Sequence, residues 1–317
     1  AEEYVRNFLA SQQADFNMNF QEFLKLYYED MTPRLRENTM RNKKYIIDLK
    51  ILPYFSNKRM NSITAADIRK WQNELISQGY SQTYLRTINN QLTAVFNYAV
   101  RYYDLQNNPC RKAGGMGKNK ADEMKFWTKD EFYKFIDSIM DKQKSYAAFM
   151  TLFWTGMRLG ELLALTPADI DFENKTISIS KSYQRLDGKD VITLPKTPKS
   201  KRTITVPDFL LADLKDYMNS IYCLEDTDRL FQVTKYFMEH EMQRGIKNSG
   251  VKRIRIHDIR HSHCALLFEM GITPLEVADR LGHERVETTM NVYAHIYPNK
   301  QRALSDKLEK VYREDLK

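Results

Sequence analysis

A basic, glycine-rich stretch at residues 107–120 interrupts the hydrophobic periodicity of the chain and divides it into two parts. The stretch, NNPCRKAGGMGKNK, has no apolar repeat and holds three of the chain's 11 glycines. This composition is typical of a flexible linker, although a surface loop inside one domain is the alternative. Because 317 residues suffice for two domains, we expect a first domain at 1–106, a linker at 107–120 and a second domain at 121–317.

Before the linker, apolar residues recur at the three- and four-residue spacing of amphipathic helices. The helix that we expect to begin at Thr64 has Asp67 three residues later, which is the spacing of a capping box. Together the predicted helices make a compact all-α domain. They cover 20–28, 37–55, 64–77 and 81–103.

After the linker, helical patterns return and then give way to alternating apolar and polar residues, the pattern of strands. We expect helices at 127–131, 146–154 and 158–165, strands at 176–180, 191–194 and 203–206, and helices again from 207 onwards. A basic turn at 196–202 is expected to join the last two strands. The sequence therefore predicts a mainly α protein with a small antiparallel β-sheet in its second domain.

The charge of the chain points to a polyanionic partner. The net charge is +8, and through residue 118 there are 17 Lys and Arg against 11 Asp and Glu. A surplus of this kind favours binding to nucleic acid.

The three scattered cysteines, no recognisable signal peptide and no long apolar run predict a reducing, cytoplasmic location and no membrane span. Since the chain starts with Ala rather than Met, we expect a trimmed or processed form.

Two kinds of site are weighed and not favoured. His257, His261 and Cys264 have the i, i+4, i+7 spacing that could place three zinc ligands on one helix face. However, no fourth ligand lies at finger spacing, and Arg260 would put a positive charge beside the metal. The segment 155–160, TGMRLG, lacks the spacing and the lysine of a phosphate-binding loop. We therefore expect no metal, no ATP and no other cofactor.

Cationic and imidazole side chains at helix starts and turns of the second domain suit phosphoryl transfer. Arg158 follows a glycine at a helix start, Lys196 lies in the basic turn, His257 and Arg260 share a helix face, and His283 follows Leu-Gly. Guanidinium groups bind phosphate oxygens, lysine can protonate a leaving oxygen, and tyrosine can be a covalent nucleophile. Taken singly, each residue is better explained as a solvated surface group or a helix cap, and only their combination and order favour a catalytic site.

Four segments, in order, resemble the motifs of the tyrosine recombinases, the phage-integrase family. They are TGMRLGELLAL at 155–165, HDIRH at 257–261, LGH at 281–283 and TTMNVYAH at 288–295. The run PKTPKSKRTI at 195–204 is most similar to integrases of phages and conjugative transposons. The resemblance covers nearly the whole chain and implies the two-domain recombinase fold, with a core-binding first domain and a catalytic second domain. Only about 15 residues precede the first predicted helix, so we expect the family's additional arm-binding domain to be absent.

The resemblance implies a mechanism that needs neither metal nor ATP. Tyr293 would attack a DNA phosphodiester, giving a 3′-phosphotyrosyl bond and a 5′-hydroxyl that is protonated by Lys196 or, as the alternative, Lys199. Glu161 would support the site. The implied catalytic residues are Arg158, Lys196, His257, Arg260, His283 and Tyr293.

The implied function is site-specific recombination that integrates, and also excises, a mobile element. The alternatives are a non-catalytic DNA-binding regulator and a DNA-relaxing enzyme. The expected partners are double-stranded recombination sites, three further copies of the chain on paired sites, and an accessory excision factor. A stripe of Leu304, Leu308 and Val311 would pack either on a neighbouring subunit or on its own domain. The predicted DNA contacts are Arg41, Lys43, Lys44, Arg86, Arg111, Lys112, Lys118, Lys199, Lys201 and Arg202.

Overall fold

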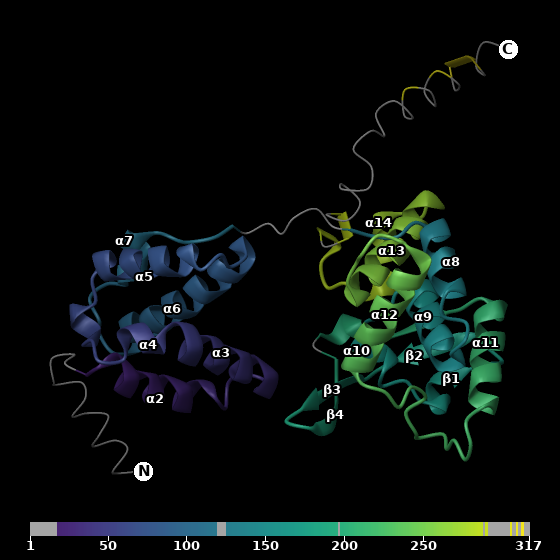
Figure 1. The fold of residues 1–317 in the computed structure, drawn as a ribbon, viewed down its shortest axis with the longest axis horizontal. Helices are drawn as coiled ribbons and strands as arrows, with labels where there is room; N and C mark the ends of the chain where they lie inside the picture. Colours follow the sequence, from purple (N-terminus) through teal and green to yellow (C-terminus); the bar gives the residue numbers. More distant parts are fainter. Residues whose placement is uncertain are drawn as a thin grey trace. The chain divides into compact units, whose positions relative to one another are not determined.

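The protein has two compact units, Ala1–Asp122 and Glu123–Lys317 (Figure 1). The computed structural model describes residues 18–118, 125–195, 197–287, 289–290, 305, 309 and 312–313. Among these residues, no helix combines the length and the apolar character that a membrane crossing requires. The predicted fold class, mainly α with little antiparallel β structure, is confirmed.

The first unit is helical throughout its described part, and the four predicted helices are present. Its core is aromatic, with Phe55 lying between Phe20 and Trp71 at ring distances of 5.7 and 5.6 Å. The capping box at the start of α5 is also confirmed, since Asp67 and Thr64 hydrogen-bond each other's backbone. The helices are α2 (Phe20–Met31), α3 (Glu37–Lys50), α4 (Leu52–Phe55), α5 (Ala65–Ser77), α6 (Gln82–Tyr102) and α7 (Pro109–Ala113).

The predicted flexible linker is wrong as far as residue 118, because this segment belongs to the first unit. Cys110 in α7 is buried, and so is Met116 beyond the helix. The side chain of Asn108 donates to the carbonyl oxygen of Thr93 and caps α7. Gly117 has φ +76°, and a Cβ there would lie 2.1 Å from the Gln82 carbonyl oxygen. The glycine at 117 therefore permits close packing and a left-handed turn, which composition alone does not distinguish from flexibility.

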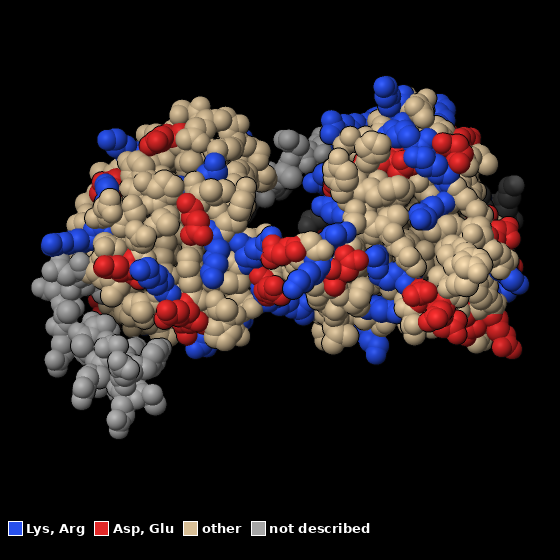
Figure 2. Space-filling view, turned by 60° about the horizontal axis from the view of Figure 1, so that its bottom comes forward, with Lys and Arg blue, Asp and Glu red and all other residues tan. Residues whose placement is uncertain are grey.

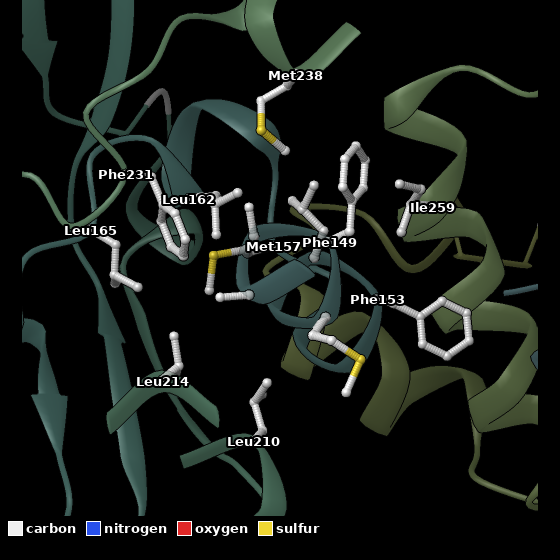
Figure 3. Close-up of a cluster of buried hydrophobic side chains, with 14 of the residues drawn as sticks. Phe149, Phe153, Met157, Leu162, Leu165, Leu210, Leu214, Phe231, Met238 and Ile259 are labelled. Atoms are coloured by element: carbon white, nitrogen blue, oxygen red, sulfur yellow. The ribbon is translucent and has the colours of Figure 1, made fainter. Parts of the chain in front are cut away.

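The second unit surrounds one central helix, α9 (Gln143–Thr155). Figure 3 shows Phe149 of α9 between Ile259 of α13 and Leu162, which follows α9, and these side chains share one buried core with Phe153. The ring of Phe153 also stacks on Phe132 of α8 at 3.8 Å. The other helices are α8 (Lys129–Asp137), α10 (Leu159–Leu162), α11 (Asp208–Asn219), α12 (Lys235–Ser249), α13 (Ile256–Glu269) and α14 (Pro274–Leu281).

The β structure of this unit is two small antiparallel sheets rather than one. Strands β1 (Ile170–Asp171), β2 (Thr176–Ile179) and β5 (Arg202–Thr205) form the first sheet in that order, with Ile177 opposite Ile204. Strands β3 (Ser182–Leu186) and β4 (Lys189–Thr193) form a separate hairpin.

The expected neighbouring strands at 191–194 and 203–206 are therefore in different sheets. Strand β3 was not predicted, because its sequence SYQRL is largely polar. The turn between β3 and β4 is Asp187-Gly188, both with positive φ. Asp-Gly is the strongest short-range signal for a hairpin, so this feature was present in the sequence.

The packing of residues 107–118 generates a stability prediction. Asn108→Ala removes a buried helix cap and the hydrogen bonds that its amide donates to the Thr93 carbonyl and to Asn97 Oδ1, so we expect a loss of about 1–3 kcal/mol in the unfolding free energy of the first unit. Asn107→Ala, at an exposed neighbour, is the matched control and should change it by less than about 0.5 kcal/mol. Urea unfolding with hydrogen exchange, which assigns the transition to a unit, measures both. Equal, small effects would restore the linker interpretation.

Candidate active site

The first arginine of the site, Arg158, is placed by a turn between two helices. Helix α9 ends at Gly156, which has φ +64°, and Arg158 is the N-cap of α10. A Cβ at Gly156 would lie 2.6 Å from both His263 and Leu281. Only glycine therefore fits this turn, which confirms the predicted helix break and places the turn at Gly156 against α13 and α14.

A buried glutamate orients Arg158. The Glu161 side chain is 4% exposed, and it accepts hydrogen bonds from the Arg158 backbone N–H and from Arg158 Nη1, both at 2.8 Å. Arg202 Nη2 donates to the same carboxylate at 3.0 Å. Burial alone would raise the pKa of Glu161, but Arg202 and Arg158 lower it overall. The group is therefore a carboxylate shared by two guanidinium groups.

The second arginine, Arg260, is a buried cation held by backbone carbonyls. It is 3% exposed, and its Nη1 and Nη2 donate to the carbonyl oxygens of Gly156 (2.8 Å) and Leu281 (2.6 Å). These carbonyls lie at the carboxyl ends of α9 and α14, where the helix dipole is negative. Burial, with the nearby charges of Arg158 and Arg202, lowers the pKa of Arg260 to about 9. No carboxylate hydrogen-bonds Arg260 in the described part of the chain.

His257 lies in the first turn of α13, on the same face as Arg260. Its ring meets that of His261 edge-on, with centroids 5.3 Å apart. Its pKa is lowered to about 4, first by the protein around the ring and then by His261, Arg260 and Arg158. Although the side chain is partly open to solvent, His257 is therefore neutral at physiological pH.

His283 enters the site directly after the glycine that ends α14. Gly282 has φ +66°, and His283 Nδ1 lies 2.7 Å from Thr289 Oγ1. Burial lowers the pKa of His283 to about 3, with contributions from Arg260 and Arg158. This imidazole is also neutral at physiological pH.

Four of the six predicted catalytic residues are thus brought together. Arg260 donates to the carbonyl oxygens of Gly156 and Leu281, which are each two residues from Arg158 and His283, and His257 lies one turn before Arg260 on α13. Lys196, Tyr293 and the stripe of Leu304, Leu308 and Val311 lie outside the described residues. The alternative lysine, Lys199, is exposed in the turn, and its carbonyl oxygen would lie 2.7 Å from a Cβ at Gly282. The turn therefore packs against the end of α14.

Arg202, one of the predicted DNA contacts, is directed inward in the structure. Its side chain is 7% exposed, and its guanidinium group donates to Glu161 and to the carbonyl oxygens of Ser200 and Arg280. The sequence held a signal for this, because Arg202, Ile204 and Val206 alternate onto one face of a strand. Another arginine beside the site, Arg280, was not predicted from the sequence. It donates to His263 Nε2 at 3.3 Å and to backbone carbonyls.

The other predicted DNA contacts differ in their surroundings. Lys43 is also directed inward, because its ammonium group donates to the Tyr27 hydroxyl (3.0 Å) and to Gln91 Oε1 (2.8 Å) and its pKa is lowered by burial. Lys44 and Arg86 are half-buried. In the view of Figure 2, basic and acidic side chains lie side by side on both units rather than forming one wholly basic face. The remaining predicted contacts are exposed: Arg41, Arg111, Lys112, Lys118, Lys199 and Lys201.

A zinc site at His257, His261 and Cys264 gains no support. Within the part of the chain that the structure describes, no cluster of three or more His, Cys, Asp or Glu side chains could hold a metal ion.

Comparison with known proteins identifies the family. Residues 125–300 match the description "Phage integrase family", and residues 19–76 match "Phage integrase, N-terminal SAM-like domain". The chain belongs to the phage integrase family. It is a tyrosine recombinase, and its activity is site-specific DNA recombination.

The relatives include integrases of mobile elements. The ICEBs1 integrase of Bacillus subtilis is 34% identical over 315 residues, which are 92% of this chain and 83% of that protein. The Tn1549 transposon integrase in complex with a circular intermediate DNA has a TM-score of 0.76 at 22% identity, covering 90% of this chain and 99% of that one. A lambda integrase tetramer bound to a Holliday junction has a TM-score of 0.68 at 16% identity, covering 92% and 80%. At these low identities, the similarity to the two solved structures shows that the fold is shared.

The turn at Gly156 generates the prediction for this site. Gly156→Ala and Gly250→Ala both place alanine in a left-handed helix cap, at a penalty of about 1–2 kcal/mol, but only Gly156 is enclosed by other side chains. We expect Gly156→Ala to lower the unfolding free energy by about 1–3 kcal/mol more than Gly250→Ala does. It should also slow DNA cleavage, because the Gly156 carbonyl holds Arg260. Urea unfolding and single-turnover cleavage check both points; equal effects of the two variants on stability and cleavage would contradict them.

Proposed function

We propose that the cluster of Arg158, His257, Arg260 and His283 binds the scissile phosphate of a DNA recombination site. The observation that carries this proposal is the buried guanidinium of Arg260, which has only carbonyl partners among the described residues. A buried cation is strongly disfavoured unless it is paired. A bound phosphodiester supplies the missing negative charge.

The two arginines and the two histidines would have different tasks. A phosphodiester under attack gathers negative charge on its non-bridging oxygens, and Arg158 and Arg260 would hold these oxygens with charge-assisted hydrogen bonds. Preorganised donors of this kind stabilise a transition state by roughly 3–4 kcal/mol each. Because His257 and His283 are neutral, they would donate hydrogen bonds without adding charge. Thr289 engages Nδ1 of His283, so Nε2 is the atom that would face the phosphate.

The proposed covalent steps are those of the family. They use Tyr293 and Lys196, which lie outside the residues that the structure describes. The phenol oxygen of Tyr293 attacks phosphorus and gives up its proton to solvent, and the bond to the 5′-oxygen breaks as Lys196 gives that oxygen a proton. The 3′-phosphotyrosyl bond keeps the energy of the phosphodiester, so the 5′-hydroxyl of a partner strand can attack it and release the tyrosine. Lys199 is the alternative proton donor.

We also propose that the first unit is the core-binding domain and that the two units together hold the duplex, chiefly by its phosphates. The exposed basic residues Arg111, Lys112 and Lys118 at and after α7 would make such contacts. The lambda integrase tetramer bound to a Holliday junction has the same fold and supports a tetramer of this chain on paired sites. This tetramer would integrate and excise a mobile element in the bacterial cytoplasm. The tail stripe would contact a neighbouring subunit, and an excision factor would assist.

A nicked suicide duplex tests the covalent chemistry. The intact protein should form a protein–DNA adduct that resists denaturant, because the short cleaved strand diffuses away before it can rejoin. Tyr293→Phe should abolish the adduct and Tyr297→Phe, the matched control, should retain it. Arg260→Met should slow adduct formation by about 100-fold or more. Adduct formation by Tyr293→Phe would refute the assignment, and transfer to a second duplex separates recombination from simple relaxation.

A further inference from the structure

We infer that Arg202 is a positioning residue of the recombination site, which orients Arg158 through Glu161 and the end of α14 through the Arg280 carbonyl. The inference rests on the proposed function, since it concerns the same phosphate site. Arg202 would not touch the DNA or the reacting atoms.

The contacts of Arg202 reach two other elements of the site. From the start of β5, its Nη1 and Nη2 donate to the two carboxylate oxygens of Glu161 on α10, at 3.3 and 3.0 Å. Its Nε donates to the carbonyl oxygen of Arg280 on α14 at 2.9 Å. Nη1 also donates to the Ser200 carbonyl at 3.1 Å. This planar, two-pronged pairing with a carboxylate is a geometry that arginine provides and lysine does not.

Through Glu161, Arg202 controls the charge that Arg158 presents to a phosphate. Arg158 Nη1 donates to the same carboxylate at 2.8 Å. With two guanidinium groups on one carboxylate, the cluster stays cationic and Arg158 is oriented without being neutralised. Without Arg202, the full negative charge of Glu161 would fall on Arg158 and compete with the phosphate for it.

Through α14, Arg202 also supports the other half of the site. The Arg280 carbonyl that it holds is next along the chain to the Leu281 carbonyl, which accepts from Arg260 at 2.6 Å. A Cβ at Gly282 would lie 3.0 Å from Arg202 Cδ. The side chain of Arg202 therefore packs against the turn at Gly282, directly before His283.

The experiment compares DNA binding and cleavage in variants of the full chain. We expect Arg202→Met to leave the affinity for the recombination site within about 2-fold and to slow single-turnover cleavage at saturating DNA by about 10-fold or more. Arg202→Lys should recover part of the loss, since one amine can keep one contact with Glu161. The double variant Arg202→Met/Glu161→Gln should be no slower than the slower single variant, because both changes break one linked arrangement.

Arg244→Met is the matched control for loss of a buried ion pair. Arg244 likewise donates to a buried glutamate, Glu241, three residues away on α12. It also donates to Asp141, which is not part of the phosphate site. We expect it to lower stability while cleavage by the folded protein stays normal.

Several outcomes would overturn the inference. If Arg202→Met binds the recombination site more weakly but cleaves it at the normal rate at saturating DNA, Arg202 is a DNA contact and not a positioning residue. Multiplicative losses in the double variant would mean that it does not act through Glu161. If Arg202→Met is poorly folded, normal cleavage by Arg202→Lys alone would also reject the role. Failure of the proposed function is distinguishable, because the unaltered protein would then form no Tyr293-dependent adduct.

Discussion

The burial of Arg260 without a carboxylate partner in the described structure is the constraint on which the site depends. Its guanidinium group donates to the Gly156 carbonyl at the end of α9 and to the Leu281 carbonyl at the end of α14. Carbonyls at helix carboxyl ends stabilise a cation by roughly 1–2 kcal/mol, and they do not cancel its charge as a carboxylate would. The fold therefore keeps a desolvated positive charge in place, and we propose that a DNA phosphate is the anion that it binds.

The rest of the site is arranged around this charge. Glu161 is the one carboxylate hydrogen-bonded to Arg158 and Arg202 in the described structure, and it holds both. Burial, together with these positive surroundings, lowers the pKa of His257 to about 4 and of His283 to about 3, so neither imidazole adds a charge. A recombinase that must bind a phosphate and then release it to a new strand benefits from this limited, fixed charge.

Most helices of the fold could be predicted from the periodicity of apolar residues, and most residues of the candidate site from the order of the family motifs. The helix break at Gly156 and the helix start before His257 were predicted, because glycine and capping patterns are local. The linker prediction failed because Cys110 and Met116 are buried by tertiary contacts that composition does not reveal. Arg202 was assigned to DNA because it lies in a basic run, whereas the alternation of its strand turns it inward. Its partner Glu161 is 41 residues away, so no local pattern could pair them.

The most direct test of the central claim is the charge dependence of Arg260. Cleavage is measured for the intact chain and for Arg260→Met, on normal DNA and on DNA whose target phosphate is a neutral methylphosphonate. If Arg260 acts by meeting the phosphate charge, the loss caused by Arg260→Met should be at least about 10-fold smaller on the neutral linkage. An equal loss on both substrates would show that the buried guanidinium supports the fold and not the bound phosphate.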